Sequence, residues 1–324
     1  MNQRKFKYII ATSAYNPNSG GIIVLHKLCD LLNTSGQEAW LCPMDFCEYF
    51  VTGKTILKTL LKRLNHPILT YRHFRLLLHN TKRFSTNPDW KTPIINPWKL
   101  FFSNGLPEYI VVYPEILSGN MLGAKHVVRY FMHNPGHFTG KVNYGYGELY
   151  FRYSNSFARD YIPLQGSTIS KHLITISTTP PCYNMNNIAT ERKGTAYIVR
   201  KGKGKTLVHD LRDSILLDNL SHEETAAILK QVKLCVCYDP ITAYSVFSLL
   251  CGCPCTIILG NNETPSTYHP SIEEQKVFNY GMNDNHVNIS EAIKWAQNRV
   301  LTQQKRNNEA VAAFIQESQN YFKI

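Results

Sequence analysis

The chain has 324 residues, of which 44% are hydrophobic and 18% charged. This composition excludes a disordered or collagen-like chain, and the length suits two α/β domains that each bury a core. With 35 Lys and Arg against 23 Asp and Glu, the net charge of +12 favours anionic partners: nucleic acid, phospholipid headgroups or a phosphorylated small molecule.

Strand-like and helix-like segments alternate in the first half, which is typical of a parallel sheet with crossover helices. The apolar run at 8–11 is too short for a signal peptide, and no stretch reaches the roughly 20 residues of a membrane span. We therefore expect a soluble, cytoplasmic protein. We predict a helix at 22–32 and strands at 6–11, 38–41, 93–96, 109–113, 125–132, 158–163 and 173–176.

A basic segment interrupts these elements at 54–83. It contains eight Lys and Arg and no acidic residue, and they alternate with leucines and isoleucines as in a pair of amphipathic helices broken near Pro67. The segment fits either a solvated face packed on its own domain or a surface that docks on an anionic inner leaflet. Nucleic-acid binding is disfavoured, because RNP-type aromatics, a zinc framework and a helix-turn-helix pattern are missing.

A domain boundary is predicted in the Pro- and Asn-rich stretch at 177–193, which cannot continue a regular element. We place the domains at 1–185 and 186–324. In the second we predict strands at 195–199, 215–217, 234–238 and 255–259, and helices at 221–231, 242–250 and 290–322. The helix at 221–231 begins with a capping box, and the last helix is long enough to cross back and tie the two halves.

Nine cysteines occur, mostly in apolar strand-like contexts such as Cys235 with Cys237 and Cys253 with Cys255. Alternating cysteines lie on one face of a strand and lack the CxxC spacing that zinc prefers. We predict buried reduced thiols, no disulfide and no metal site.

The first constellation with chemical meaning is the loop after the first strand, which ends in Gly20 and Gly21 before a helix. Glycines let backbone N–H groups approach a ligand closely, and the helix start favours an anion. The loop is not a GxGxxG motif, so dinucleotide binding is disfavoured; it also fits a plain turn between strand and helix.

The second constellation follows the first strand of the second domain. Basic residues alternate there with two glycines at the carboxyl end of a strand, where open α/β sheets bind ligands. Fixed cations at this place would stabilise a departing diphosphate without a metal, although a solvated basic turn has the same pattern. The residues are Arg200, Lys201, Lys203 and Lys205.

The third constellation runs from Asp239 through Thr242 and Ser245 to the turn at 251–254. Hydroxyls and free amides in the first turn of a helix can hold a phosphate. Helix capping by Asp239 and Thr242 is the alternative.

Together these three features resemble the GT-B glycosyltransferases of bacterial lipopolysaccharide and capsule synthesis. The likeness follows nearly the whole chain in order: Gly20 and Gly21 before a helix with His26 and Leu28, the basic turn 200–205, and the unit that ends at Pro254. It implies an α/β chain of GT-B architecture, with two Rossmann-like domains facing a central cleft and a C-terminal helix that crosses back. The N-terminal domain would bind the acceptor and the C-terminal domain the nucleotide-sugar donor, without a metal or other cofactor.

By position, the resemblance implies that Arg200 and Lys205 hold the donor diphosphate, with Lys201 and Lys203 beside them. Thr242 and Ser245 would hold phosphate or ribose. Three residues of the first domain follow: Gly20 and Gly21 would face the donor phosphates or the acceptor, and His133 would contact a sugar.

One position departs from the pattern of retaining members, which carry two glutamates eight positions apart in the third constellation. Asp239 and Phe247 stand there in this chain. An inverting enzyme needs a general base for the acceptor hydroxyl, and Glu115, just past a strand, is the first candidate. Asp45 and His26 are weaker candidates.

The expected function is therefore metal-independent transfer of a sugar from a nucleotide-activated donor to a glycan or glycolipid acceptor. The expected place is the cytoplasm, with possible peripheral contact at the inner membrane through 54–83 and no nucleic-acid partner. The alternatives are a non-catalytic basic scaffold for membrane or RNA, and a nucleotide-sugar epimerase on the same architecture.

Overall fold

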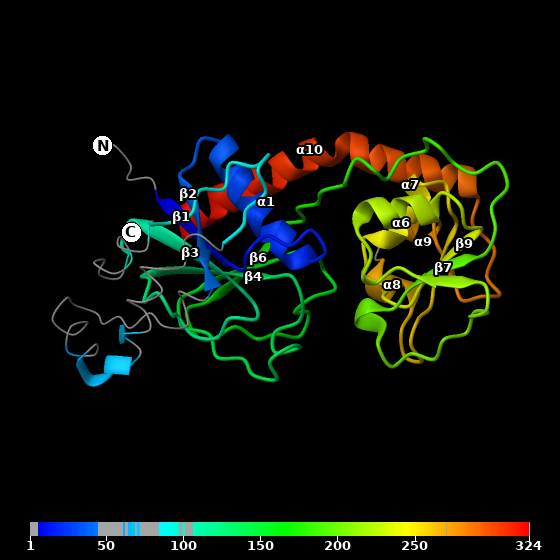
Figure 1. Cartoon of the computed structure of the whole chain (residues 1–324). Coiled ribbons are helices and arrows are strands. Elements are labelled where there is room, and N and C mark those ends of the chain that lie inside the picture. Colours follow the sequence, from blue (N-terminus) through cyan, green and yellow to red (C-terminus); the bar gives the residue numbers. More distant parts are fainter. Residues whose placement is uncertain are drawn as a thin grey trace. The chain divides into compact units, whose positions relative to one another are not determined.

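A computed structural model describes residues 6–44, 61, 64–68, 70–71, 84–96, 100, 106–269 and 271–323 of the chain (Figure 1). The chain divides into two compact units. Unit 1 comprises Met1–Ser177 with Lys305–Ile324, and unit 2 comprises Thr178–Gln304. The boundary lies eight residues before the expected one at 185/186, and the end of the chain belongs to unit 1.

Unit 1 is built on a sheet of six parallel strands in the order β2-β1-β3-β4-β5-β6. Ile94 adds a single parallel bridge to Leu41 on the outer side of β2. The strands are β1 (Lys7–Thr12), β2 (Ala39–Pro43), β3 (Tyr109–Pro114), β4 (His126–Phe131), β5 (Leu149–Arg152) and β6 (Thr168–Leu173).

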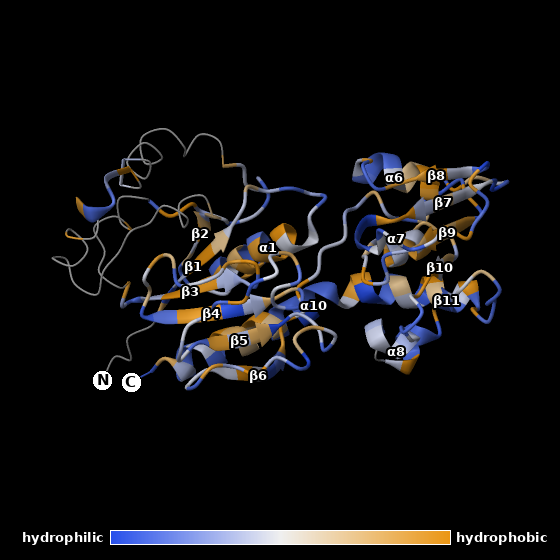
Figure 2. Cartoon of the chain, turned by 90° about the horizontal axis from the view of Figure 1, so that it is seen from below, coloured by the Kyte–Doolittle hydropathy of each residue, from blue (hydrophilic) through white to orange (hydrophobic). Residues whose placement is uncertain are grey.

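The two faces of this sheet are covered differently. Helices α1 (Gly20–Thr34) and α10 (Ile289–Tyr321) pack on one face, where Val128 and Tyr130 meet Leu28 and Phe314 in one core. On the other face the crossovers 115–125, 132–148 and 153–167 contain no helix. Every residue of β3 and β4 is nevertheless buried, and Figure 2 shows hydrophobic residues along the strands. The loops cover this face together with the helical residue Leu100, which is buried in one core with Ile9 and Val111.

Unit 2 contains a sheet of five parallel strands in the order β11-β10-β9-β7-β8. The predicted capping box at Ser221 and Glu224 is confirmed at the start of α6. The strands are β7 (Thr195–Ile198), β8 (Ser214–Leu216), β9 (Leu234–Cys237), β10 (Cys255–Ile257) and β11 (Asn279–Tyr280). The helices are the 3-10 turn η1 (Arg200–Gly202), α6 (His222–Leu229), α7 (Tyr244–Leu250), α8 (Pro265–Tyr268) and α9 (Ile272–Gln275).

Helix α10 belongs to both units. Ala292 and Ala296, near its start, are buried in the core of unit 2, whereas Val311 and Phe314 are buried in the core of unit 1. The expected α/β class, with two parallel-sheet units of Rossmann type and a C-terminal helix that returns to the first, is confirmed. None of the helices described by the structure is long and apolar enough to cross a bilayer.

Two strand predictions in unit 1 are wrong, and a third, at 93–96, is reduced to the single bridge at Ile94. The segment 158–163 is a loop, because Ala158 takes a left-handed φ of 51° that a strand cannot contain. Strand β6 ends at Leu173, so the strand expected at 173–176 begins where the real one stops. The four-residue strand β5 was not expected, since its short apolar run follows a glycine-rich loop.

Candidate functional site

The strand order of unit 2 reverses between β7 and β9, which lie side by side. Parallel sheets leave a crevice at the carboxyl ends of such strands, because the following chains turn to opposite faces. The basic turn that starts at Arg200 follows β7, and Asp239 and Thr242 follow β9. The second and third constellations of the sequence therefore meet at one switch point.

The backbone of the basic turn is fixed tightly against β9. A Cβ on Gly202 would lie 2.2 Å from the carbonyl oxygen of Tyr238, so only glycine fits there. The amides of Val199 and Arg200 donate to the two oxygens of Asp218 at 2.9 and 2.8 Å. These bonds hold Arg200 at its left-handed φ of 36°.

The Arg200 guanidinium has a defined position. It donates to the Tyr244 hydroxyl at 2.9 Å and lies 4.4 Å from the centre of that ring. A guanidinium carries five N–H donors in a planar fork, which suits it to bind phosphate oxygens. Tyr244 thus orients a cation at the switch point.

Lys205 is engaged differently from the expectation. Its ammonium forms an ion pair with Glu263 at 3.0 Å and donates to the carbonyl of Ile258 at 2.9 Å. Glu263 also accepts from the Gly260 amide and the Tyr268 hydroxyl. Lys205 therefore anchors the end of the basic turn to the loop after β10, and its charge is already balanced.

The other predicted residues of unit 2 differ in exposure. Lys201 and Lys203 are exposed, and Thr242 is half-buried. Ser245 is 3% exposed and donates to the Thr242 carbonyl at 2.9 Å, so its hydroxyl serves the start of α7.

Asp239 is buried beside these cations. Burial raises the pKa of its carboxyl, and the charges of Lys201 and Arg200 oppose that rise. One oxygen of Asp239 accepts the Ile241 amide, which ties the strand end to the following loop.

Unit 1 has a second switch point, between β1 and β3. Gly21 lies at the start of α1, and its Cβ position is 3.6 Å from the end of the Met132 side chain. The Met132 amide donates to Glu115 Oε2 at 3.1 Å. The structure therefore brings together Gly21, Glu115 and the end of β4, which continues into His133.

Glu115 and His133 are both nearly buried, at 5% and 7% exposure. The His133 ring packs against His137, with centroids 4.0 Å apart, and against Phe138 and Phe157. Glu115 is held at both ends, since its backbone carbonyl accepts the Tyr144 hydroxyl at 2.6 Å.

The two weaker base candidates have other positions. His26 is fully buried in α1 and donates through Nε2 to the Ser13 carbonyl at 2.9 Å. Burial lowers its pKa, so it ties the first loop to the helix as a neutral ring. Asp45 lies outside the described residues, as does most of the basic segment 54–83. Leu64, Ile68 and Tyr71 of that segment are described and are 65–75% exposed.

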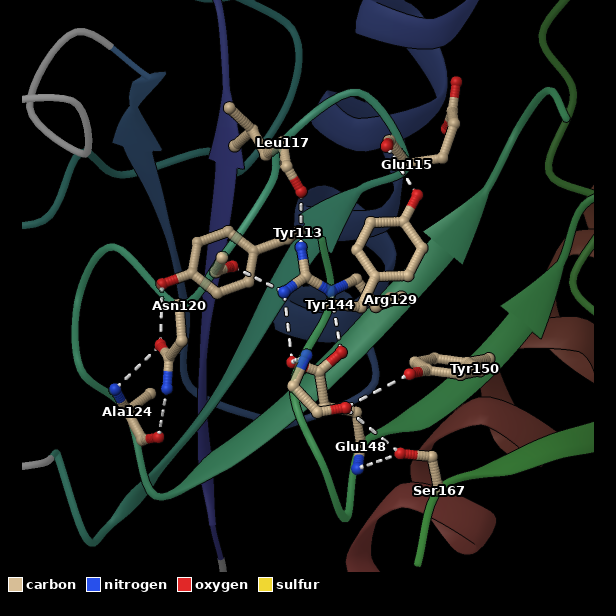
Figure 3. A network of polar contacts seen from close by, with 12 residues as sticks. Tyr113, Glu115, Leu117, Asn120, Ala124, Arg129, Tyr144, Glu148, Tyr150 and Ser167 are labelled. Atoms are coloured by element: carbon tan, nitrogen blue, oxygen red, sulfur yellow. Dashed lines mark hydrogen bonds and ion pairs between the residues drawn. The ribbon is translucent and has the colours of Figure 1, made fainter. Parts of the chain in front are cut away.

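A buried ion pair beneath Glu115 was not expected from the sequence (Figure 3). Arg129, fully buried in β4, binds both carboxylate oxygens of Glu148 at 2.8 and 3.0 Å. Two further N–H groups donate to the carbonyls of Leu117 and Gly119 in the crossover that starts at Glu115. The rings of two tyrosines cover the guanidinium at 4.4 and 5.1 Å. Arg129 thereby fixes the crossover that follows β3, on the face of the sheet opposite α1 and α10.

All eight described cysteines are free thiols. Cys235, Cys237 and Cys255 form the group with metal-ligand spacing among the residues described, with Sγ atoms within 4.8 Å of one another. They lie on one face of β9 and β10 in the dry core, where the pKa of each thiol is raised. A metal would need thiolates there, so this environment favours protonated, hydrophobic thiols.

No protein-family model matches the chain, and no curated protein sequence matches it. Its structure is similar to that of a sucrose-phosphate synthase from Thermosynechococcus elongatus (9% identity, 97% of this chain and 96% of that one, TM-score 0.42). A glycosyltransferase from Rickettsia africae (10%, 98% and 95%, 0.41) and an alpha-glucosyltransferase in complex with UDP and DNA (13%, 98% and 98%, 0.38) are also similar. At these scores the similarity establishes neither a family nor an activity for the chain.

Proposed function

We propose that the chain is a GT-B glycosyltransferase that moves a sugar from a nucleotide-activated donor to a surface-polysaccharide or lipooligosaccharide acceptor. The observation that carries this proposal is the switch point of unit 2. An oriented arginine and the exposed Lys201 and Lys203 follow β7 there, and Thr242 follows β9, both at the carboxyl end of a parallel sheet. Cationic and hydroxyl groups of this kind bind the oxygens of a diphosphate.

The diphosphate would be the leaving group. As the glycosidic bond breaks, the bonding electrons pass to the diphosphate oxygen, and Arg200 with the two exposed lysines would stabilise the negative charge. These side chains supply positive charge without a divalent ion. Lys205, balanced by Glu263, would position the turn instead of binding the phosphate.

The acceptor would bind unit 1, at Gly20 and Gly21 with Glu115 and His133. In an inverting reaction Glu115 would take the proton from the acceptor hydroxyl as that oxygen attacks the anomeric carbon. The Met132 amide and the Tyr144 hydroxyl hold Glu115 in place, which supports this role because a base must be positioned before it acts.

The first test is nucleotide binding by thermal shift and calorimetry, with UDP, GDP, CMP and ADP in EDTA. We expect one diphosphate to raise the melting temperature, because a ligand of the native state stabilises it by mass action. Arg200→Gln should weaken that binding about 10- to 100-fold, since a hydrogen bond to a charged group contributes about 1.5–3 kcal/mol.

Arg212→Gln is the matched control, because Arg212 is a fully solvated arginine of the same unit that pairs with Asp210. It should leave nucleotide binding unchanged. If no nucleotide binds, or if both variants lose binding equally, the chain is better described as a basic scaffold whose binding depends on charge alone.

Peripheral membrane contact belongs to the same proposal. Leu64, Ile68 and Tyr71 expose apolar surface within a segment rich in Lys and Arg. Co-sedimentation with vesicles that contain anionic phospholipid, compared with neutral vesicles, tests this contact. The proposed membrane contact is refuted if the protein binds neither kind of vesicle or binds both equally.

A further inference from the structure

Unit 2 has an open pocket of mixed polar and apolar lining against the flank of α6, formed by residues within 182–187 and 223–231. Its volume is about 410 Å³, within the range of roughly 300–1,000 Å³ of small-molecule sites. Helical spacing places Glu223, Ala227 and Lys230 on the same flank of α6, and Asn186 and Asn187 line the opposite wall.

The walls are fixed by hydrogen bonds. Lys230 Nζ donates to Asn184 Oδ1 at 3.0 Å, and the Asn184 amide group donates in turn to the Pro181 carbonyl at 2.8 Å. The Asn186 backbone amide binds the same Asn184 oxygen at 2.9 Å. Asn187 takes a left-handed φ of 59°. The shape of the pocket is therefore largely preformed.

The charges of the lining disfavour phosphate and nucleotide ligands. Glu223 and Lys230 bring one negative and one positive charge, so the pocket carries no net charge that would favour a phosphate or a nucleotide. The carboxamides of Asn186, Asn187 and Gln231 offer both donors and acceptors.

The rest of the lining is apolar and consists of Cys182, Ala226 and Ala227. Ala226 and Ala227 lie between the polar groups and leave space that larger side chains would fill. Paired donors and acceptors around an aliphatic floor match a ligand with adjacent hydroxyls and a C–H face.

From this combination we infer that the pocket of α6 binds a neutral saccharide, as a subsite separate from the basic switch point. The inference goes beyond the proposed function and depends only on residues of unit 2. A glycan that occupies it would be held to the protein without taking part in bond transfer.

Saturation-transfer difference NMR tests the inference with N-acetylglucosamine, lactose, cellobiose and maltose as probes. We expect at least one of them to bind in the millimolar range, which corresponds to about −4 kcal/mol. Ala227→Phe should weaken binding at least tenfold, because Ala227 is exposed on α6 and the new ring would fill the pocket. Asn186→Ala with Gln231→Ala should weaken it without adding bulk.

Ala312→Phe is the matched control, since Ala312 is also an exposed helical alanine, and it should leave saccharide binding unchanged. Arg200→Gln separates this site from the proposed donor site: saccharide binding should persist in it while diphosphate binding falls. The inference is overturned if no probe binds, if Ala227→Phe and the double variant both bind normally, or if Arg200→Gln abolishes saccharide binding.

Discussion

The buried ion pair between Arg129 and Glu148 makes a quantitative prediction. In Glu148→Gln the Arg129 guanidinium stays buried without its counter-charge, and removal of one partner of a buried pair costs about 3–5 kcal/mol. Arg129→Met also leaves the carbonyls of Leu117 and Gly119 without their donors, at about 1–3 kcal/mol each. We therefore expect Arg129→Met to be the more destabilising variant.

Urea unfolding measures these effects. Trp295 is the one tryptophan of the sequence within the range of unit 2, so a Trp295→Phe background removes the fluorescence of that unit. With an m-value of about 2 kcal/mol/M, a loss of 3 kcal/mol lowers the midpoint by about 1.5 M. Glu148→Gln should show a shift of that size.

A double variant and a surface control show whether the loss of stability comes from the buried ion pair. The double variant should lose about 2–3 kcal/mol less unfolding free energy than the sum of the losses in Arg129→Met and Glu148→Gln. The reason is that neither charge remains buried in it. Glu38→Gln breaks the exposed pair with Lys7 and should cost at most about 1 kcal/mol. Full additivity, or an unchanged midpoint in Glu148→Gln, would refute the idea that this pair holds the loops.

Two further predictions concern unit 2. Gly202→Ala should destabilise it by about 2 kcal/mol or more and weaken nucleotide binding, because the new Cβ would overlap the Tyr238 carbonyl. The control is Gly20→Ala in unit 1, whose Cβ meets open space; it should change stability by less than about 1 kcal/mol when both variants are unfolded in urea in the chain that keeps Trp295. Burial lowers the pKa of His269 to about 4 from its ordinary 6.5. As the pH falls, the unfolded chain therefore takes up a proton on this ring at a higher pH than the folded chain does. The stability of unit 2 should therefore fall as the pH drops from 6.5 to 4, by up to about 3 kcal/mol, and His269→Gln should flatten this dependence in melting curves recorded across the window.

The parallel sheets could be predicted because strands such as β1, β3 and β9 are nearly continuous apolar runs. Once 195–199 and 234–238 are parallel neighbours, the turn at Arg200 and the segment at Asp239 must meet at their carboxyl ends. Local pattern was sufficient for that, and also for the capping box of α6.

Pairings between distant charges could not be predicted in this way. Arg129 and Glu148 are 19 positions apart, and Lys205 and Glu263 are 58 apart, so no helical or strand period links them. An arginine within an apolar strand is the signal that was available for the first pair, because such a charge is buried only with a partner. For Lys205 the pattern indicated a ligand contact, and the structure instead places a carboxylate beside it.

Helix α10 has a consequence for how the protein is made. The apolar face of the sheet in unit 1, including Tyr8 and Phe151, is completed by Val311 and Phe314. During translation these two residues leave the ribosome after all of unit 2 has been synthesised. The part of the chain made first therefore cannot close its core until the part made second is finished. We expect the nascent unit 1 to expose this face for most of its synthesis and to need protection from aggregation in that interval.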